Sequence, residues 1–151
     1  MALAVMSKVD ILTKNTTTVF SHYFQNSGPN LKQALGTTLI LCRMRIGRSY
    51  LKSHGFAINL SSSDRCMCGA VDDNKHLLLF CFIFQEERQT MLSKINSILP
   101  NFLSLTISKQ VFILLNGINL DSLLPDPRNR LIMLTVQKFI TQTNRFSKHY
   151  E

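Results

Sequence analysis

The chain has 151 residues, 45% of them hydrophobic, which suits one domain with a core of its own. Its 17 Lys and Arg residues against 9 Asp and Glu residues give a net charge of +8, which favours a polyanionic partner such as nucleic acid but also serves solubility. The apolar runs are too short for a membrane span or a secretory signal. We therefore expect an intracellular protein, nuclear or cytoplasmic, with reduced cysteines and no membrane partner.

The first part of the chain mixes aliphatic residues with the β-branched run NTTTV at 15–19, which has low helix propensity. We expect a helix near 3–14 and a second one toward Phe24. The strongest breaker is NSGPN at 26–30. It predicts an N-terminal arm, 1–28, followed by a helical domain, 29–151.

The segment 31–54 is predicted to be one long helix that Gly55 ends. Steps of three and four place a single apolar stripe on it, formed by Leu35, Leu39, Cys42, Ile46 and Tyr50. This stripe predicts the buried side of the helix. Cys42 is then a core residue and not a metal ligand.

The outward side of the same helix is basic. Arg45, Arg48 and Lys52 share one face, with Arg43 to one side, and a guanidinium offers a planar fork that binds phosphates. A solvated helix face explains the pattern equally well. Arg88, further along, could reach an aspartate of the preceding segment or a phosphate.

Three of the four cysteines and one histidine lie in the segment 65–88. Cys66, Cys68, His76 and Cys81 follow the order C-x-C-x7-H-x4-C, which is the ligand count of one structural zinc ion. Zinc has no geometric preference of its own, so a turn and a helix end can surround it. Gly69 suits the sharp turn after the first two ligands. The pattern predicts a zinc knuckle.

An ordinary core role for these four residues stays open. Cysteine is among the most buried residue types, and the apolar run 77–84 lies beside His76 and contains Cys81. The single residue between Cys66 and Cys68 is shorter than the usual spacing of about two to four. The five-residue step from His76 to Cys81 also misses a clean helix face. A helix that begins near Asn74 would ease this second difficulty.

That helix is predicted to continue to about Leu99, apolar all round and therefore buried as far as Phe84, then amphipathic. Pro100 ends it. A short helix at 106–116 stops at Gly117, and Pro127 opens a last helix. This last helix should bury Leu131, Leu134, Phe139 and Ile140 and leave outside Arg128, Arg130, Lys138, Arg145 and Lys148. The fold class is mainly α, a small helical domain with an inserted zinc-knuckle turn.

Several of these motifs together resemble the C-terminal region of non-LTR retrotransposon reverse transcriptases. That region commonly combines an arginine-rich apolar helix carrying a Gly-His pair, a Cys-x-Cys-Gly knuckle with an acidic pair, a His-Leu-rich run ending in Cys, and a nearby Arg. The corresponding stretches are LCRMRIGRSYL (41–51), CMCGAVDD (66–73), HLLLFC (76–81) and Arg88, and FITQTNRF (139–146) is similar to the closing helix. Arg48 stands where the family usually has histidine.

No enzyme constellation accompanies these motifs: the aspartate pair of a polymerase turn, the acidic tetrad of a ribonuclease H and a glycine-rich phosphate loop are all missing from the sequence. The resemblance implies a non-catalytic zinc-knuckle module that binds RNA or single-stranded DNA, with a polymerase domain on another chain as a possible partner. Its candidate nucleic-acid contacts are Arg43, Arg45, Arg48, Lys52 and Arg88. The alternative is a stranded fragment or a protein-interaction module without a nucleic-acid role.

Overall fold

The computed structural model describes residues 31–120, 123–124 and 126–149, and those from Lys32 onward belong to one compact unit. The predicted N-terminal arm, 1–28, with its helices, lies outside the described residues. Within them the chain is mainly helical and contains no strand, which confirms the predicted fold class. None of the described helices is long and apolar enough to cross a membrane.

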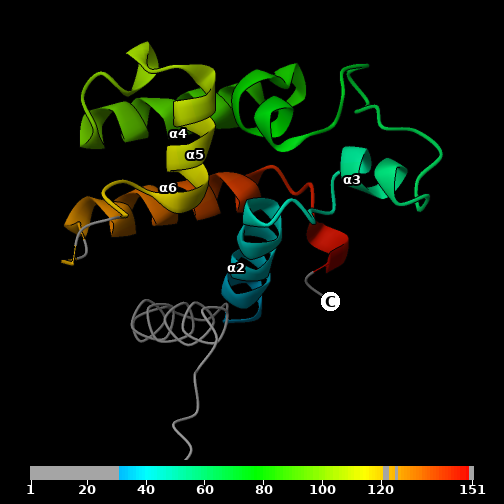
Figure 1. The fold of residues 1–151 in the computed structure, drawn as a ribbon, viewed down its shortest axis with the longest axis horizontal. Coiled ribbons are helices and arrows are strands. Elements are labelled where there is room, and N and C mark those ends of the chain that lie inside the picture. The colour runs from blue at the N-terminus through cyan, green and yellow to red at the C-terminus, as the bar shows by residue number, and fades with distance from the viewer. Residues whose placement is uncertain (1–30, 121–122, 125, 150–151) are drawn as a thin grey trace, which may run out of the picture. The chain divides into compact units, whose positions relative to one another are not determined.

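Five α-helices and four single turns make up the described chain (Figure 1). The α-helices are α2 (Leu31–Arg45), α3 (Lys52–Ala57), α4 (Gln85–Ile98), α5 (Ile107–Asn116) and α6 (Pro127–Gln142). A π-helical turn (His76–Phe80) and a 3-10 turn (Phe82–Phe84) precede α4, and two more 3-10 turns are Phe102–Ser104 and Ser147–His149. The segment between α3 and the π-helical turn holds the first two predicted ligands, Cys66 and Cys68.

The core lies where α4 and α5 pack on α6 (Figure 1). Each helix contributes a short row of buried side chains, among them Met91 and Ile95 from α4, Leu114 from α5, and Val136 and Phe139 from α6. Helix α2 adds Ile40, Leu41 and Met44 to the same core. Two side-chain hydrogen bonds also join α2 to α6, Thr37 to Thr141 (3.3 Å) and Gln137 Nε2 to Thr38 Oγ1 (3.1 Å).

The short helix begins and ends at the residues that the sequence predicts, and the last helix begins where the sequence predicts it. The Thr106 side chain accepts a hydrogen bond from the Lys109 N–H (3.4 Å), and Gly117, with φ at 87°, follows the last residue of α5. Asp126 accepts from the Arg128 N–H (2.9 Å), and Pro127 occupies the first turn of α6. These local signals determine the ends of α5 and the start of α6.

The prediction of one long helix over 31–54 is wrong, because α2 ends at Arg45. Gly47 has φ at 70°, and the Arg48 N–H returns to the Arg43 carbonyl (2.9 Å) while the Gly47 N–H returns to Met44 (3.2 Å). This is the hydrogen-bond pattern of a helix that a left-handed glycine terminates. A separate short helix, α3, then begins at Lys52.

The apolar stripe predicted on this helix is also wrong. Leu35, Leu39 and Ile46 are 50%, 49% and 69% exposed, whereas the α2 residues buried against the domain are Thr37, Ile40, Leu41 and Met44. Helix α2 has apolar residues on more than one face, so its periodicity does not select a face by itself. The face that meets α6 becomes the buried one.

Two further burial predictions need correction. The apolar run 77–84 is not buried all round, since Phe80, Phe82 and Ile83 are exposed. The chain also breaks at Cys81, whose ψ of 115° separates the π-helical turn from the next one. In α6 the exposed fractions of Leu131 and Leu134 are 50% and 45%, and Ile132 and Val136 are buried in their place, together with the predicted Phe139 and Ile140.

Candidate metal centre

The structure brings the four predicted ligands together. One ligand atom from each of Cys66, Cys68, His76 and Cys81 lies within 4.8 Å of all the others. The Cys66 and Cys81 sulfurs are 3.8 Å apart, and the Cys68 sulfur is 3.1 Å from His76 Nε2. Among the described residues this is the one group of at least three His, Cys, Asp or Glu side chains spaced to hold a metal ion.

The geometry fits a tetrahedral ion. Zinc–sulfur bonds of about 2.3 Å put tetrahedral sulfur ligands about 3.8 Å apart, which matches the Cys66–Cys81 separation. All four cysteines of the chain are free thiols, so none is lost to a disulfide. Cys66, His76 and Cys81 are buried and Cys68 is half-buried. Four protein ligands in a buried position make a closed site that can hold a metal ion.

A tight hairpin positions the first two ligands. The Cys66 N–H donates to the Ala70 carbonyl (2.8 Å), the Gly69 N–H donates to the Cys66 carbonyl (2.9 Å), and Arg65 pairs with Val71 in an antiparallel bridge. Gly69 has φ at 92°, a left-handed conformation that glycine adopts without steric cost, as predicted. The turn directs both thiols at the same point, so the short spacing between them does not prevent a shared ion.

The other two ligands lie at the two ends of a π-helical turn. Asp73 caps the start of this segment by accepting from the His76 N–H (2.7 Å), and the helical conformation begins at Asn74, as predicted. The Cys81 N–H then donates to the His76 carbonyl (2.7 Å), an i to i+5 bond. In a π-helix a step of five residues is about one turn. The spacing that misses an α-helical face therefore places His76 and Cys81 together.

The thiols differ in their readiness to lose a proton. Burial raises the pKa of Cys81 to about 11. A hydrogen bond from the Ala70 backbone lowers the pKa of Cys68 below its ordinary value. A metal binds the thiolate, so an ion entering this site must displace the proton of Cys81.

Arg88 supports the site from within the protein. Its side chain is buried and its guanidinium donates to the Cys81 carbonyl. Burial lowers the pKa of this guanidinium. Arg88 is therefore not a surface cation, and its hydrogen bond fixes the backbone at the point where Cys81 leaves the π-helical turn.

Asp72 is a structural residue that the sequence did not single out. Its carboxylate is buried, accepts from the Lys52 N–H at the start of α3 (2.9 Å) and forms an ion pair with Arg145. The Asp72 N–H also donates to the Asp64 carbonyl (2.8 Å). Asp72 thus links the knuckle to α3 and to the end of the chain. In the sequence Asp72 is one of several residues that can cap a helix, and nothing in the sequence pattern predicts its contacts with Lys52 and Arg145.

No family model, curated protein or solved structure matches this chain. The resemblance to retrotransposon reverse transcriptases therefore stays a prediction from the sequence motifs. The chemistry of the site follows from its own four side chains and from the contacts that hold them.

The predicted basic face does not exist as a helix face, because α2 ends at Arg45. Arg45 points inward and donates to the Leu115 carbonyl and to the Met133 sulfur (3.1 Å), and burial lowers its pKa. Arg43 lies over the Tyr50 ring at 4.4 Å, and its Nε donates to the Arg48 carbonyl (3.1 Å). The Arg48 side chain is exposed.

Three of the five predicted nucleic-acid contacts therefore remain near the surface: Arg43, Arg48 and Lys52. Arg43 and Lys52 are half-buried, and Lys52 is the first residue of α3. Arg45 and Arg88 instead donate to carbonyls of the protein itself. Of these three cations, Arg48 lies on the loop between α2 and α3, Arg43 lies near the end of α2, and Lys52 begins α3. The Lys52 N–H donates to the Asp72 carboxylate of the knuckle.

Proposed function

We propose that this chain is a non-catalytic nucleic-acid-binding module that one structural zinc ion stabilises. The proposal rests on one observation: four residues that match the knuckle of the reverse transcriptase C-terminal region lie together with the spacing of metal ligands. In this proposal the module grips RNA or single-stranded DNA for a polymerase domain on another chain.

Zinc is the ion that suits the donor set best. Three thiols and one imidazole are soft and borderline ligands, which zinc binds in structural sites, whereas magnesium and calcium prefer oxygen. Four protein ligands leave no open coordination position for a substrate or an activated water molecule. The ion would therefore hold the hairpin to the π-helical turn and take no part in a reaction.

The absence of polymerase and nuclease activity belongs to the same proposal. Phosphoryl-transfer enzymes of these classes use clustered carboxylates to hold divalent ions. The acidic residues beside the knuckle have other partners, since Asp72 pairs with Arg145 and Asp73 caps the His76 N–H. Primer extension or hybrid cleavage that persists through repurification would contradict this part of the proposal.

The α2–α3 loop and the helix ends on either side of it supply the proposed contacts with phosphate. Arg48, on the loop, is exposed, and Arg43 of α2 and Lys52 of α3 are half-buried. A flexible polyanion can meet such a loop without a groove, because phosphate contacts need only cations within reach of the backbone.

The test is the salt dependence of binding to a single-stranded RNA 12-mer. The double substitution Arg48→Gln and Lys52→Gln should weaken binding and flatten the slope of log affinity against log salt by about one unit for each cation that no longer meets a phosphate. The control is Lys94→Gln with Lys138→Gln, which removes the same charge from exposed positions of α4 and α6. Equal effects of the two double variants would leave only a non-specific attraction and contradict the proposal.

A second function has its own supporting observation. Leu35 and Leu39 on α2, and Ile46 directly after its last residue, are exposed at steps of four and seven residues. An apolar row of this kind suits contact with another protein. If the chain fails to bind RNA and single-stranded DNA at low salt, a protein-interaction module without a nucleic-acid role becomes the better conclusion.

A further inference from the structure

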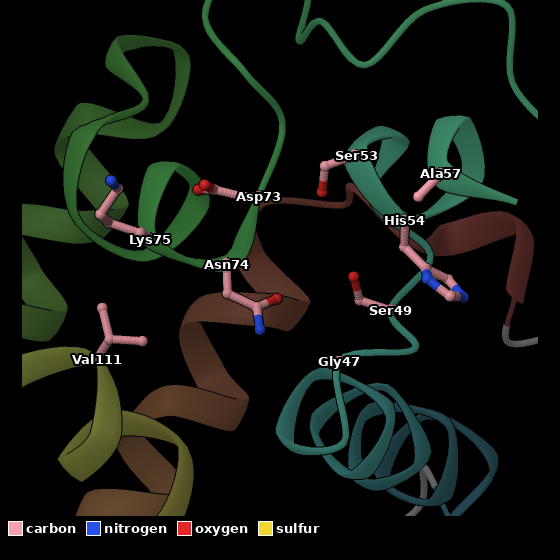
Figure 2. Close-up of a pocket in the computed structure, with 9 residues that line it drawn as sticks. All are labelled: Gly47, Ser49, Ser53, His54, Ala57, Asp73, Asn74, Lys75 and Val111. Carbon is pink, nitrogen blue, oxygen red and sulfur yellow. The ribbon is translucent and has the colours of Figure 1, made fainter. Parts of the chain in front are cut away.

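A cavity of about 440 Å³ lies beside the knuckle and is separate from the metal ligands. Its walls come from the α2–α3 loop, α3, the turn that precedes the π-helical turn, and α5 (Figure 2). Gly47, Ser49, Ser53, Asn74 and Val111 are among the residues that line it. The volume lies within the range of small-molecule sites, which is about 300 to 1,000 Å³.

Asn74 brings an unsatisfied acceptor to this cavity. Its Nδ2 donates to the Met44 carbonyl (2.9 Å), which fixes the orientation of the amide. Its Oδ1 is buried and has no hydrogen-bond partner among the described residues. A buried acceptor without a donor is costly, so a donor from a molecule bound in the cavity would stabilise this oxygen.

Two hydroxyl groups face the same space. Figure 2 shows the Ser49 and Ser53 hydroxyls directed into the space that the Asn74 amide borders. Ser49 Oγ accepts a long hydrogen bond from the Leu51 N–H (3.4 Å), which leaves its proton to donate. The Ser53 backbone is held by its N–H bond to the Asp72 carbonyl (3.2 Å). Together the three side chains offer one fixed acceptor and two adaptable hydroxyls.

We propose that this cavity receives an unpaired nucleobase that carries an exocyclic amine, with the amine donating to Asn74 Oδ1. The inference rests on the proposed nucleic-acid function and deepens it, because it assigns base recognition to a place other than the cationic loop. Ser49 and Ser53 meet the ring nitrogens and carbonyls, since a hydroxyl both donates and accepts. Val111 provides an apolar wall for the planar ring.

Asn74 Oδ1 favours a hydrogen-bond donor over an anion as its partner. The carboxylate of Asp73 also lines the cavity, and it already accepts from the His76 N–H (2.7 Å). His54 and Lys75 line the cavity as well, so they can meet the ring nitrogens or the phosphate of the same nucleotide. Arg48 and Lys52 adjoin the lining residues Gly47, Ser49 and Ser53 in sequence, so a base in the cavity leaves its backbone phosphate near these cations.

The experiment compares two single-stranded RNA 12-mers, one of adenosine and one of purine riboside, which is adenosine without its 6-amino group. The protein should bind the adenosine 12-mer about tenfold more tightly, the scale of one buried hydrogen bond. Ala57→Phe, which fills the cavity from α3, should remove this preference and keep the salt slope. Ser93→Phe, at an exposed position of α4, is the matched control and should keep both.

Equal binding of the two 12-mers by the unaltered protein would overturn the inference while leaving the proposed function intact. If neither 12-mer binds, the proposed function fails, and adenosine 5′-monophosphate becomes the probe for the cavity. Amide shifts at Ser49, Ser53 and the Asn74 side chain that purine riboside monophosphate does not reproduce would support the inference. The absence of such shifts would overturn it. Zinc content and thermal unfolding of each variant report whether its fold is retained.

Discussion

The Arg145 guanidinium donates to the Asp72 carboxylate across 73 residues of sequence. The Asp72 side chain is 1% exposed and that of Arg145 is 18% exposed, so water screens this ion pair only weakly. The pair joins the residue that follows the metal-binding hairpin to the segment that follows α6. The closing part of the chain thereby stabilises the knuckle from outside it.

Asp72→Asn should lower the free energy of unfolding by about 3 kcal/mol, because it leaves the guanidinium without its charge partner and weakens the acceptor for the Lys52 N–H. Chemical denaturation with measurement of the midpoint and slope checks this value. The matched control is Asp64→Asn, which removes the partner of Arg65 in an exposed pair and should cost at most about 1 kcal/mol. Similar decreases in the free energy of unfolding in both variants would show that the buried ion pair stabilises the fold no more than the exposed one.

The protein purified without chelators should contain about one zinc ion per chain, measured by elemental analysis. Cys81→Ala should lose both the metal and thermal stability, because binding of a structural ion is coupled to folding. Cys42→Ser, a half-buried cysteine outside the cluster, should keep its zinc. A zinc-free protein that unfolds at the same temperature as the zinc-loaded one would mean that the four residues are ordinary core residues and not metal ligands.

The π-helical turn can be tested by changing its length. Inserting one alanine after Phe80, whose side chain is 52% exposed, converts the five-residue step between His76 and Cys81 into a six-residue step. Cys81 then turns away from His76 by about a quarter turn, the rotation of one helical residue, and zinc binding should be lost. Phe80→Ala keeps the spacing and should keep the ion. Retention of zinc in the insertion variant would show that the turn adapts.

Gly117→Ala should be more harmful than Gly47→Ala, although both glycines have positive φ values, 87° and 70°. A Cβ at Gly117 would lie 2.5 Å from Asn129 Oδ1, whereas a Cβ at Gly47 meets nothing within 4 Å. Asn129 cannot easily move, since its amide bonds both the N–H (2.7 Å) and the carbonyl (2.8 Å) of Ile118. We expect a loss of about 1 kcal/mol at Gly47 and about 2 to 3 kcal/mol at Gly117, measured by thermal unfolding.

Local chemistry in the sequence determined the elements whose signals are complete within a few residues. Thr106 and Gly117 delimit α5, Pro127 opens α6, and Gly69 makes the turn of the knuckle. The four metal ligands could be predicted for the same reason. Three thiols and one imidazole within a short segment are the donor set of a structural zinc site. Each of these predictions depends only on a property of the residue itself, either its backbone preference, as for glycine and proline, or its ligand atoms, as for cysteine and histidine.

Tertiary contacts decided which faces are buried and which cations remain at the surface. The stripe from Leu35 to Ile46 was a regular pattern, yet α6 packs on the neighbouring face of α2 and leaves the stripe exposed. Arg45 and Arg88 look like surface charges in sequence, but carbonyls 70 and 7 residues away accept their hydrogen bonds. Periodicity describes a helix by itself, whereas burial is a property of two surfaces in contact. For the same reason the Asp72–Arg145 pair and the Asn74 cavity exist only in the folded chain.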